Sequence, residues 1–174
     1  MINCNDAITG YTRQNCLLVS SGVKKFYVGS FSADTTSWTR NSENVITSGT
    51  NTPTFYAYEM LEGTASATET LVVNGRLKTV GVTQAIEMIF IGQSQTNRNT
   101  YNQLLSGAWS VIVQSENTGE YVLFGEDRGM ERSEGSATFG VEIDSDNEMR
   151  LTLSCRASDA ADTIDSTFVA TLIA

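Results

Sequence analysis

The sequence contains no histidine, and its three cysteines are spaced without a C-x-x-C pair. Histidine is the commonest proton shuttle and metal ligand in proteins, so any catalysis would depend on carboxylates, lysine, tyrosine or cysteine. The odd cysteine count favours buried free thiols over disulfides or a zinc site. We therefore expect no enzyme activity, no metal site and no cofactor; an enzyme based on carboxylates alone ranks last among the possible functions.

Positive charge is scarce, since 11 Lys and Arg face 20 Asp and Glu and the formal net charge is −9. Such a surface repels polyanions and lacks the cationic patch on which nucleic-acid affinity depends. Tight or sequence-specific DNA binding is disfavoured. A conduit through which DNA slides would, however, benefit from like charge, because the DNA would not adhere to it.

Long apolar runs are also missing. No stretch approaches the roughly 20 apolar residues of a membrane span, and the N-terminus lacks the basic start and apolar run of a secretory signal. We expect a protein that folds in a cytosol without membrane contact. A chain of 174 residues is long enough to bury a sizeable core, so residues 1–174 are predicted to form a single domain.

Abundant Thr, Ser, Asn and Gly, with 40% hydrophobic residues and only one proline, are typical of strands joined by polar turns. The predicted fold is mainly β: an antiparallel β-sandwich or rolled barrel with one short α-helix and a long hairpin. The segment 32–43 is expected to be a loop. Outside the long hairpin, strands are predicted at 16–20, 23–31, 44–48, 54–61, 109–114, 120–125, 136–143, 148–155 and 166–174.

The long hairpin is predicted over 68–92, with a type I′ turn at Asn74-Gly75. Its second arm is apolar on both faces, which requires either a sandwich neighbour or another subunit. We interpret it as an assembly element that extends a sheet from subunit to subunit. The residues expected to mediate assembly are Val72, Val73, Asn74, Gly75, Ile86, Met88 and Phe90.

One helix is predicted over 97–107, with Asn97 as N-cap and Gly107 at its end. A hairpin then follows in "WSVIVQSENTGEYVLFGEDRGM", and its charged end starts a mobile connecting loop. Glu126, Asp127 and Arg128 in this loop have no histidine, metal pattern or nucleophile beside them. We therefore interpret them as surface charges at a subunit boundary.

Three other patterns were considered as sites. The segment that begins at Asp144 resembles a calcium loop, but Met149 stands where the motif requires glycine and Cys155 where it requires glutamate. Gly125, Gly129 and Gly135 form no phosphate-binding fingerprint and are interpreted as loop pivots. Trp38 lies in a polar segment and, with a tyrosine, could form an aromatic platform for a sugar.

The order of these elements resembles the tail-tube-like proteins of phages that infect Bacteroidota, including the neck and tail ring proteins of crAss-like phages. The resemblance extends from "AITG" at 7–10 to "LTLSC" at 151–155. Its most specific part is the helix followed by "VIVQSENTGEYVLFGEDRGM". It implies a tail-tube-like domain whose long hairpin contributes to a barrel around a central channel.

The resemblance further implies a structural virion protein that forms a hexameric or dodecameric ring in a phage tail, neck or collar. Its partners would be itself and neighbouring portal, neck or tail proteins, and DNA would pass through without specific binding. It would be assembled in the host cytoplasm and reside in the virion. The alternative is a β-sandwich binding module for a carbohydrate or receptor, or a capsid decoration protein.

Overall fold

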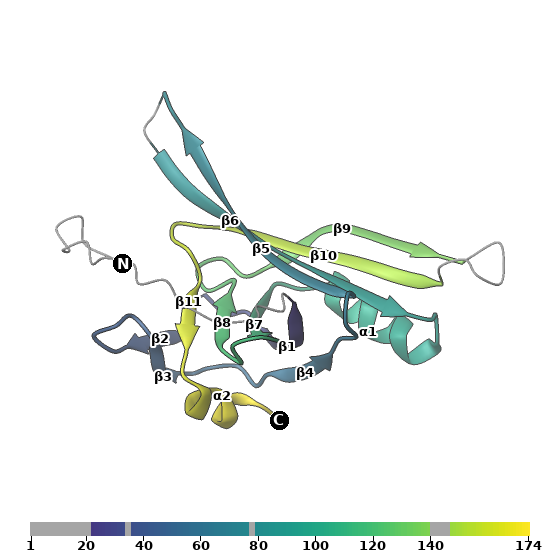
Figure 1. Cartoon of the computed structure of the whole chain (residues 1–174), viewed down its shortest axis with the longest axis horizontal. Helices are drawn as coiled ribbons and strands as arrows, with labels where there is room; N and C mark the ends of the chain where they lie inside the picture. The colour runs from purple at the N-terminus through teal and green to yellow at the C-terminus, as the bar shows by residue number, and fades with distance from the viewer. Residues whose placement is uncertain (1–21, 34–35, 77–78, 140–146) are drawn as a thin grey trace.

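The structure is a computed structural model that describes residues 22–33, 36–76, 79–139 and 147–174. The predicted strand at 16–20 lies outside these ranges. The described chain is mainly β, as predicted, and forms two sheets and two helices (Figure 1). The strands are β1 Val23–Ser30, β2 Ser37–Arg40, β3 Ile46–Thr50, β4 Tyr56–Glu59, β5 Ala65–Asn74, β6 Thr79–Ile91, β7 Trp109–Ser115, β8 Tyr121–Phe124, β9 Glu131–Thr138, β10 Glu148–Ala157 and β11 Asp162–Ile164; the helices are α1 Gln95–Leu105 and α2 Ser166–Leu172.

The larger sheet has seven strands in the order β2-β3-β11-β8-β7-β1-β4. Its centre is the antiparallel pair β1 and β7, in which Phe26 lies opposite Val113 and Val28 opposite Val111. All four side chains are buried. A strand in the middle of a sheet with both faces covered is expected to contain consecutive apolar residues, as "VIV" at 111–113 in β7 does.

The smaller sheet has four strands in the order β5-β6-β10-β9, all antiparallel to their neighbours. Its inner face packs on the larger sheet. Ile86 and Met88 of β6 meet Leu151 and Leu153 of β10 there, and they bury their side chains with Phe26 and Val113 of β1 and β7 in one cluster. Met149 of β10 is buried on the same face as Leu151 and Leu153. Leu104 of α1 completes this cluster.

The opposite face of the larger sheet carries a second core, which α2 covers. Val169 and Leu172 of α2 pack with Tyr27, Ile46 and Phe55. The prediction of a C-terminal strand at 166–174 is therefore wrong, and the structure has a second helix. Asp165 is the N-cap, and its carboxylate accepts hydrogen bonds from the backbone N–H groups of the first helical turn.

Helix α1 begins and ends two residues earlier than predicted, at Gln95 and Leu105. Its N-cap is Ser94, whose hydroxyl accepts a hydrogen bond from the Asn97 backbone N–H at 3.2 Å. The Asn97 side chain, the predicted cap, donates instead to the backbone carbonyls of residues 91 and 92. The helix therefore starts directly after β6 and anchors the end of that strand.

Two short strands lie in segments expected to be loops. β2 falls within 32–43 and β11 within the polar stretch before the C-terminal helix, and both pair with β3. β9 begins at Glu131 rather than 136, and the predicted strand residues 140–143 lie outside the described ranges. Gly135 is thus a strand residue rather than a loop pivot; an added Cβ there would lie 2.4 Å from the Tyr101 hydroxyl.

The connection between β5 and β6 differs from the predicted two-residue turn. Asn74 pairs with Thr79, so residues 75–78 link the strands. Neither Asn74 nor Gly75 has a positive φ, as a type I′ turn would require at both positions. The Asn74 side chain instead accepts a hydrogen bond from the Arg76 N–H at 3.1 Å, which is the local geometry of an Asx turn.

Candidate assembly surface

The ends of β5 and β6 project beyond the body of the sandwich (Figure 1). Gln84 marks the point at which the inner face of β6 leaves the body. This side chain is only 3% exposed. Its amide oxygen accepts a hydrogen bond from the Gly125 N–H at 3.0 Å, and its amide nitrogen donates to Glu69 at 3.3 Å. The bond to Gly125 joins the smaller sheet to the turn after β8, so the hairpin is anchored to the body at the point where it begins to project.

From Gln84 toward the tip of the hairpin, the inner face stays apolar, but the larger sheet no longer covers it. Leu71 lies opposite Val82, and Val73 lies opposite Val80, all on the face that carries Ile86 and Met88. We call Leu71, Val73, Val80 and Val82 the overhang. Leu71, Val73 and Val80 are 64%, 58% and 61% exposed, although each has a side chain suited to a core. Leu71, Val73 and Val80 thus form a core face that no other part of the described chain covers, whereas Val82, which is nearest the body, is partly buried.

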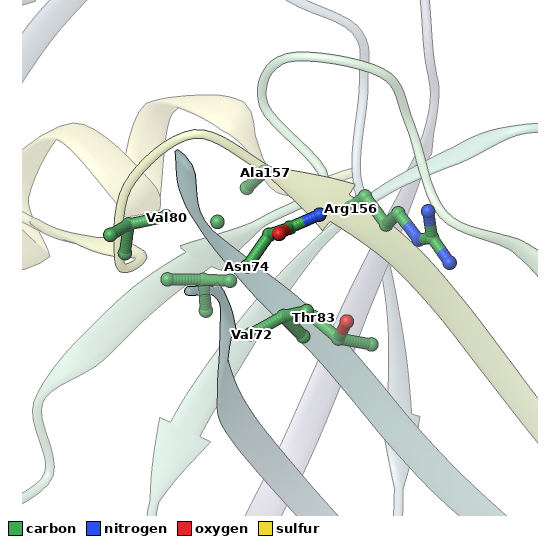
Figure 2. Close-up of a pocket in the computed structure, with 8 residues that line it drawn as sticks. Val72, Asn74, Val80, Thr83, Arg156 and Ala157 are labelled. Atoms are coloured by element: carbon green, nitrogen blue, oxygen red, sulfur yellow. The ribbon is translucent and has the colours of Figure 1, made fainter. Parts of the chain in front are cut away.

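A hollow of about 210 Å³ lies where β10 ends (Figure 2), and residues from both faces of the hairpin line it, including Val80 and Val82 of the overhang. β10 pairs with β6 as far as Ala157 opposite Val82, so the rest of β6 has a strand neighbour only in β5. Val72 and Asn74 line the hollow from β5, and Arg156 lines it from β10. Val72 is exposed, which leaves apolar surface on both sides of the projecting end.

The structure divides the residues predicted to mediate assembly. Val72, Val73, Asn74 and Gly75 are exposed at the projecting end. Ile86 and Met88 are fully buried in the intersheet core, and Phe90 packs against it. These three stabilise the subunit itself and present little or no surface to a neighbour.

Leu71 and Val80 belong to the overhang but were not among the predicted residues. The available signal was the alternation that places Val80 on the same face as Ile86. That alternation cannot say where the body of the protein ends.

The outer face of the smaller sheet is rich in hydroxyl groups and carries two arginines, Arg150 and the exposed Arg156. Arg150 in its middle forms ion pairs with Glu87, at 3.5 Å, and with Glu148. Register places the other outer-face residues opposite one another across the strands. Those with hydroxyl groups are Ser66, Thr68, Thr70, Thr83, Ser136, Thr138, Thr152 and Ser154.

Glu126 and Asp127, predicted as boundary charges, bind other parts of the same chain. Both oxygens of Glu126 accept hydrogen bonds from Arg40, at 2.5 and 2.6 Å, and Arg40 also donates to Asp162 at 2.6 Å. Asp127 accepts a hydrogen bond from the Ser158 hydroxyl at 3.1 Å. The turn 125–129 is therefore anchored to β2, β11 and the loop after β10, rather than being the predicted mobile loop.

Arg128 is exposed in this turn, so of the three charges it is the one most open to a neighbour. Gly125 and Gly129, at φ 75° and 68°, are the pivots of the turn, as predicted.

Trp38 is not the exposed loop residue that was expected. It lies in β2 and packs edge to face on Phe168 of α2, with ring centroids 6.3 Å apart. A different group of aromatic residues, Tyr56, Tyr58 and Trp109, lines a groove of about 770 Å³ between β4 and α1. Tyr56 is exposed there.

The described residues contain no cluster of three or more His, Cys, Asp or Glu that could hold a metal ion. Of the calcium-like segment, Asp144 lies outside the described ranges and Glu148 pairs with Arg150. Cys155 is a free thiol, and burial raises its pKa to about 11, which makes it a poor nucleophile at neutral pH. Neither α1 nor α2 has the length and apolar content needed to cross a membrane.

Comparisons with protein-family models, with curated proteins and with solved structures found no match to this chain.

Proposed function

We propose that this protein is a structural virion subunit that assembles into a ring in a phage tail, neck or collar and forms part of the channel through which DNA passes. One observation carries the proposal: the core face of the β5–β6 hairpin continues past the body as the uncovered overhang. The resemblance of the sequence to tail-tube-like proteins supports the same function. The protein is not an enzyme in this proposal.

Exposing the overhang has a cost that contact with another subunit would remove. Burying one exposed leucine or valine side chain stabilises a protein by about 1.5–3 kcal/mol. Leu71, Val73 and Val80 lie together on one face, and contiguous exposed apolar residues typically mark a contact surface. A second copy of the chain is the occupant we propose, because the same sheet also has two open edges.

Those edges are β5 and β9, the outer strands of the smaller sheet. Every residue of β9 is exposed. An uncovered strand edge offers unpaired N–H and C=O groups to another strand. Pairing β5 of one copy with β9 of the next would be a head-to-tail contact, and repeated contacts of that kind close into a ring when the rotation per subunit permits.

In such a ring the smaller sheet has only one face available to the channel. Its inner face packs on the larger sheet, so the outer face would face the DNA, with its hydroxyl groups, its paired Arg150 and the exposed Arg156. A lumen with few free cations would hold DNA weakly. Hexameric and dodecameric rings both remain compatible with this arrangement, as do portal, neck or tail neighbours above and below.

The test is negative-stain imaging and size-exclusion chromatography of the Val73→Asp variant. A carboxylate on the overhang should abolish rings while the subunit stays folded. Thr70→Asp is the matched control, since it adds the same charge to the same strand on the opposite, polar face. If purified protein stays monomeric over a wide concentration range and with virion neighbours present, the proposal fails.

The predicted boundary role now depends on Arg128. Arg128→Glu reverses an exposed charge and should weaken ring formation without unfolding the subunit, because surface changes away from specific contacts rarely alter stability by more than about 0.5 kcal/mol. Unchanged ring assembly in this variant would remove Arg128 from the boundary.

The aromatic groove between β4 and α1 favours a second candidate, the carbohydrate-binding or receptor-binding module. Trp38 no longer supports it, but Tyr56 and Trp109 line a groove large enough for a sugar ring. Glycan-array binding that is lost in Tyr56→Ala and retained in Trp38→Phe would support this function instead. Absence of glycan binding by the wild-type protein would reject it.

A further inference from the structure

Asn74 and Gly75 form the one Asn-Gly sequence in the chain, and it stands at the end of the overhang. Both residues are exposed. Asparagine is among the thermally labile residues of proteins, and its side-chain amide can be attacked by the backbone nitrogen of the following residue. A Cβ on that residue hinders the attack, and glycine has none.

The local geometry favours this attack. The Asn74 Oδ1 atom accepts a hydrogen bond from the Arg76 N–H at 3.1 Å, so the side chain lies along the Gly75 peptide unit. The same hydrogen bond withdraws electron density from the Asn74 Cγ atom and makes it more electrophilic. Among the described residues, apart from the two chain neighbours of Gly75, no atom lies within 4 Å of the position that a Cβ would take there. Among the described residues, no hydrogen bond involves the Gly75 N–H.

We propose that Asn74 is a site of self-modification by deamidation. The Gly75 backbone nitrogen loses its proton and forms a bond to Asn74 Cγ. The bond from Cγ to Nδ2 breaks, and the side-chain nitrogen leaves as ammonia with that proton. Water then opens the resulting succinimide at either carbonyl, which yields aspartate or isoaspartate. No oxidant, metal or enzyme is required.

Either product changes the end of the hairpin. Aspartate places a negative charge two residues from Val72 on the outer face of β5, at the far end of the hairpin. Isoaspartate also inserts a methylene group into the backbone, which disrupts the pairing of Asn74 with Thr79. This consequence rests on the proposed function: if the overhang joins subunits, a subunit with converted Asn74 would form rings less readily. The fraction of such subunits would rise as unassembled protein ages.

The experiment incubates the full-length protein at mildly alkaline pH and follows each asparagine by peptide mapping and mass spectrometry, with enzymatic isoaspartate methylation as a second readout. Asn74 should gain about one dalton before any other asparagine. Gly75→Ala is the matched control. It should fold normally, because Gly75 lacks a positive φ, and it should slow conversion by about tenfold or more through the added Cβ.

Equal rates in Gly75→Ala and wild type, or an Asn74 that stays intact while other asparagines convert, would overturn the modification site. Its effect on assembly is measured separately, by imaging Asn74→Asp and aged wild-type protein. Rings of normal yield from both would overturn that effect alone. A wild-type protein that never forms rings would contradict the proposed function, whereas the mass change at Asn74 would still be measured.

Discussion

The two sheets of this protein use apolar side chains differently. The larger sheet is covered on both faces, by the smaller sheet on one side and by α2 on the other. The smaller sheet is covered on its inner face only, and its β5–β6 end extends past that cover. This difference shows that an apolar strand face predicts burial, but it does not identify the element or subunit that covers it. In the larger sheet the same chain supplies the cover; for the overhang we propose that another copy does.

The largest expected effect comes from the covered part of β6. Met88→Asp would place an unpaired carboxylate in the intersheet core, where Met88 is fully buried. We expect the variant to lose about 4 kcal/mol or more of unfolding free energy, or not to fold at all. Urea denaturation followed by circular dichroism measures this. A folded Met88→Asp subunit of normal stability would contradict the assignment of this residue to the core.

A smaller effect is expected at Arg40, which connects β2 to the turn 125–129 and to β11. Arg40→Met leaves Glu126 and Asp162 without their shared partner. Because these groups are partly exposed, we expect a loss of about 1–2 kcal/mol in unfolding free energy. Arg128→Met is the control, because Arg128 lies in the turn 125–129 that Arg40 contacts. It should change the unfolding free energy by less than about 0.5 kcal/mol. Equal effects of the two substitutions would show that the ion pairs contribute nothing specific.

The next prediction concerns α2, which covers one face of the larger sheet and begins at the N-cap Asp165. Hydrogen bonds from the Thr167 hydroxyl and from two backbone N–H groups lower the pKa of Asp165 below its ordinary value of 3.8. Its contribution to stability is therefore present above that value and disappears as the pH falls through the lowered pKa.

Asp165→Ala should decrease Tm modestly at neutral pH through loss of the N-cap. Asp165→Asn keeps a capping side chain but cannot titrate, so its Tm should fall less steeply on acidification than that of the wild type. Parallel pH profiles of Tm for Asp165→Asn and wild type would refute the cap's role in acid sensitivity.

The smallest effect on stability is expected in the overhang. Val80→Ser and Leu71→Ser should change the unfolding free energy of the subunit by no more than about 0.5 kcal/mol, because both side chains are already exposed. Their effect should appear in assembly, as fewer rings at a given concentration. A loss of stability as large as that of Met88→Asp would mean that the overhang is covered within the subunit.

Period-two alternation predicted the long strands well. β1, β7, β8 and β10 lie close to their expected positions. The short strands β2 and β11 escape sequence-based prediction because both are polar and depend on distant partners, β2 on β3 and β11 mainly on β8, which no local pattern shows. The β-branched residues of α2 favour a strand, which is why 166–174 reads as one, although Asp165 and the spacing of Val169 and Leu172 are helix signals.

The sequence by itself determined the β-rich class, the alternation of strand faces, the negative net charge and the Asn-Gly pair, because composition, periodicity and neighbouring residues are local properties. Only the tertiary structure decided which apolar residues are core and which are surface. Ile86 and Val80 lie on one face of one strand, but the body of the protein ends between them, at Gln84. Burial depends on which elements pack against a strand. The sequence of the strand alone does not specify how far along it those elements extend.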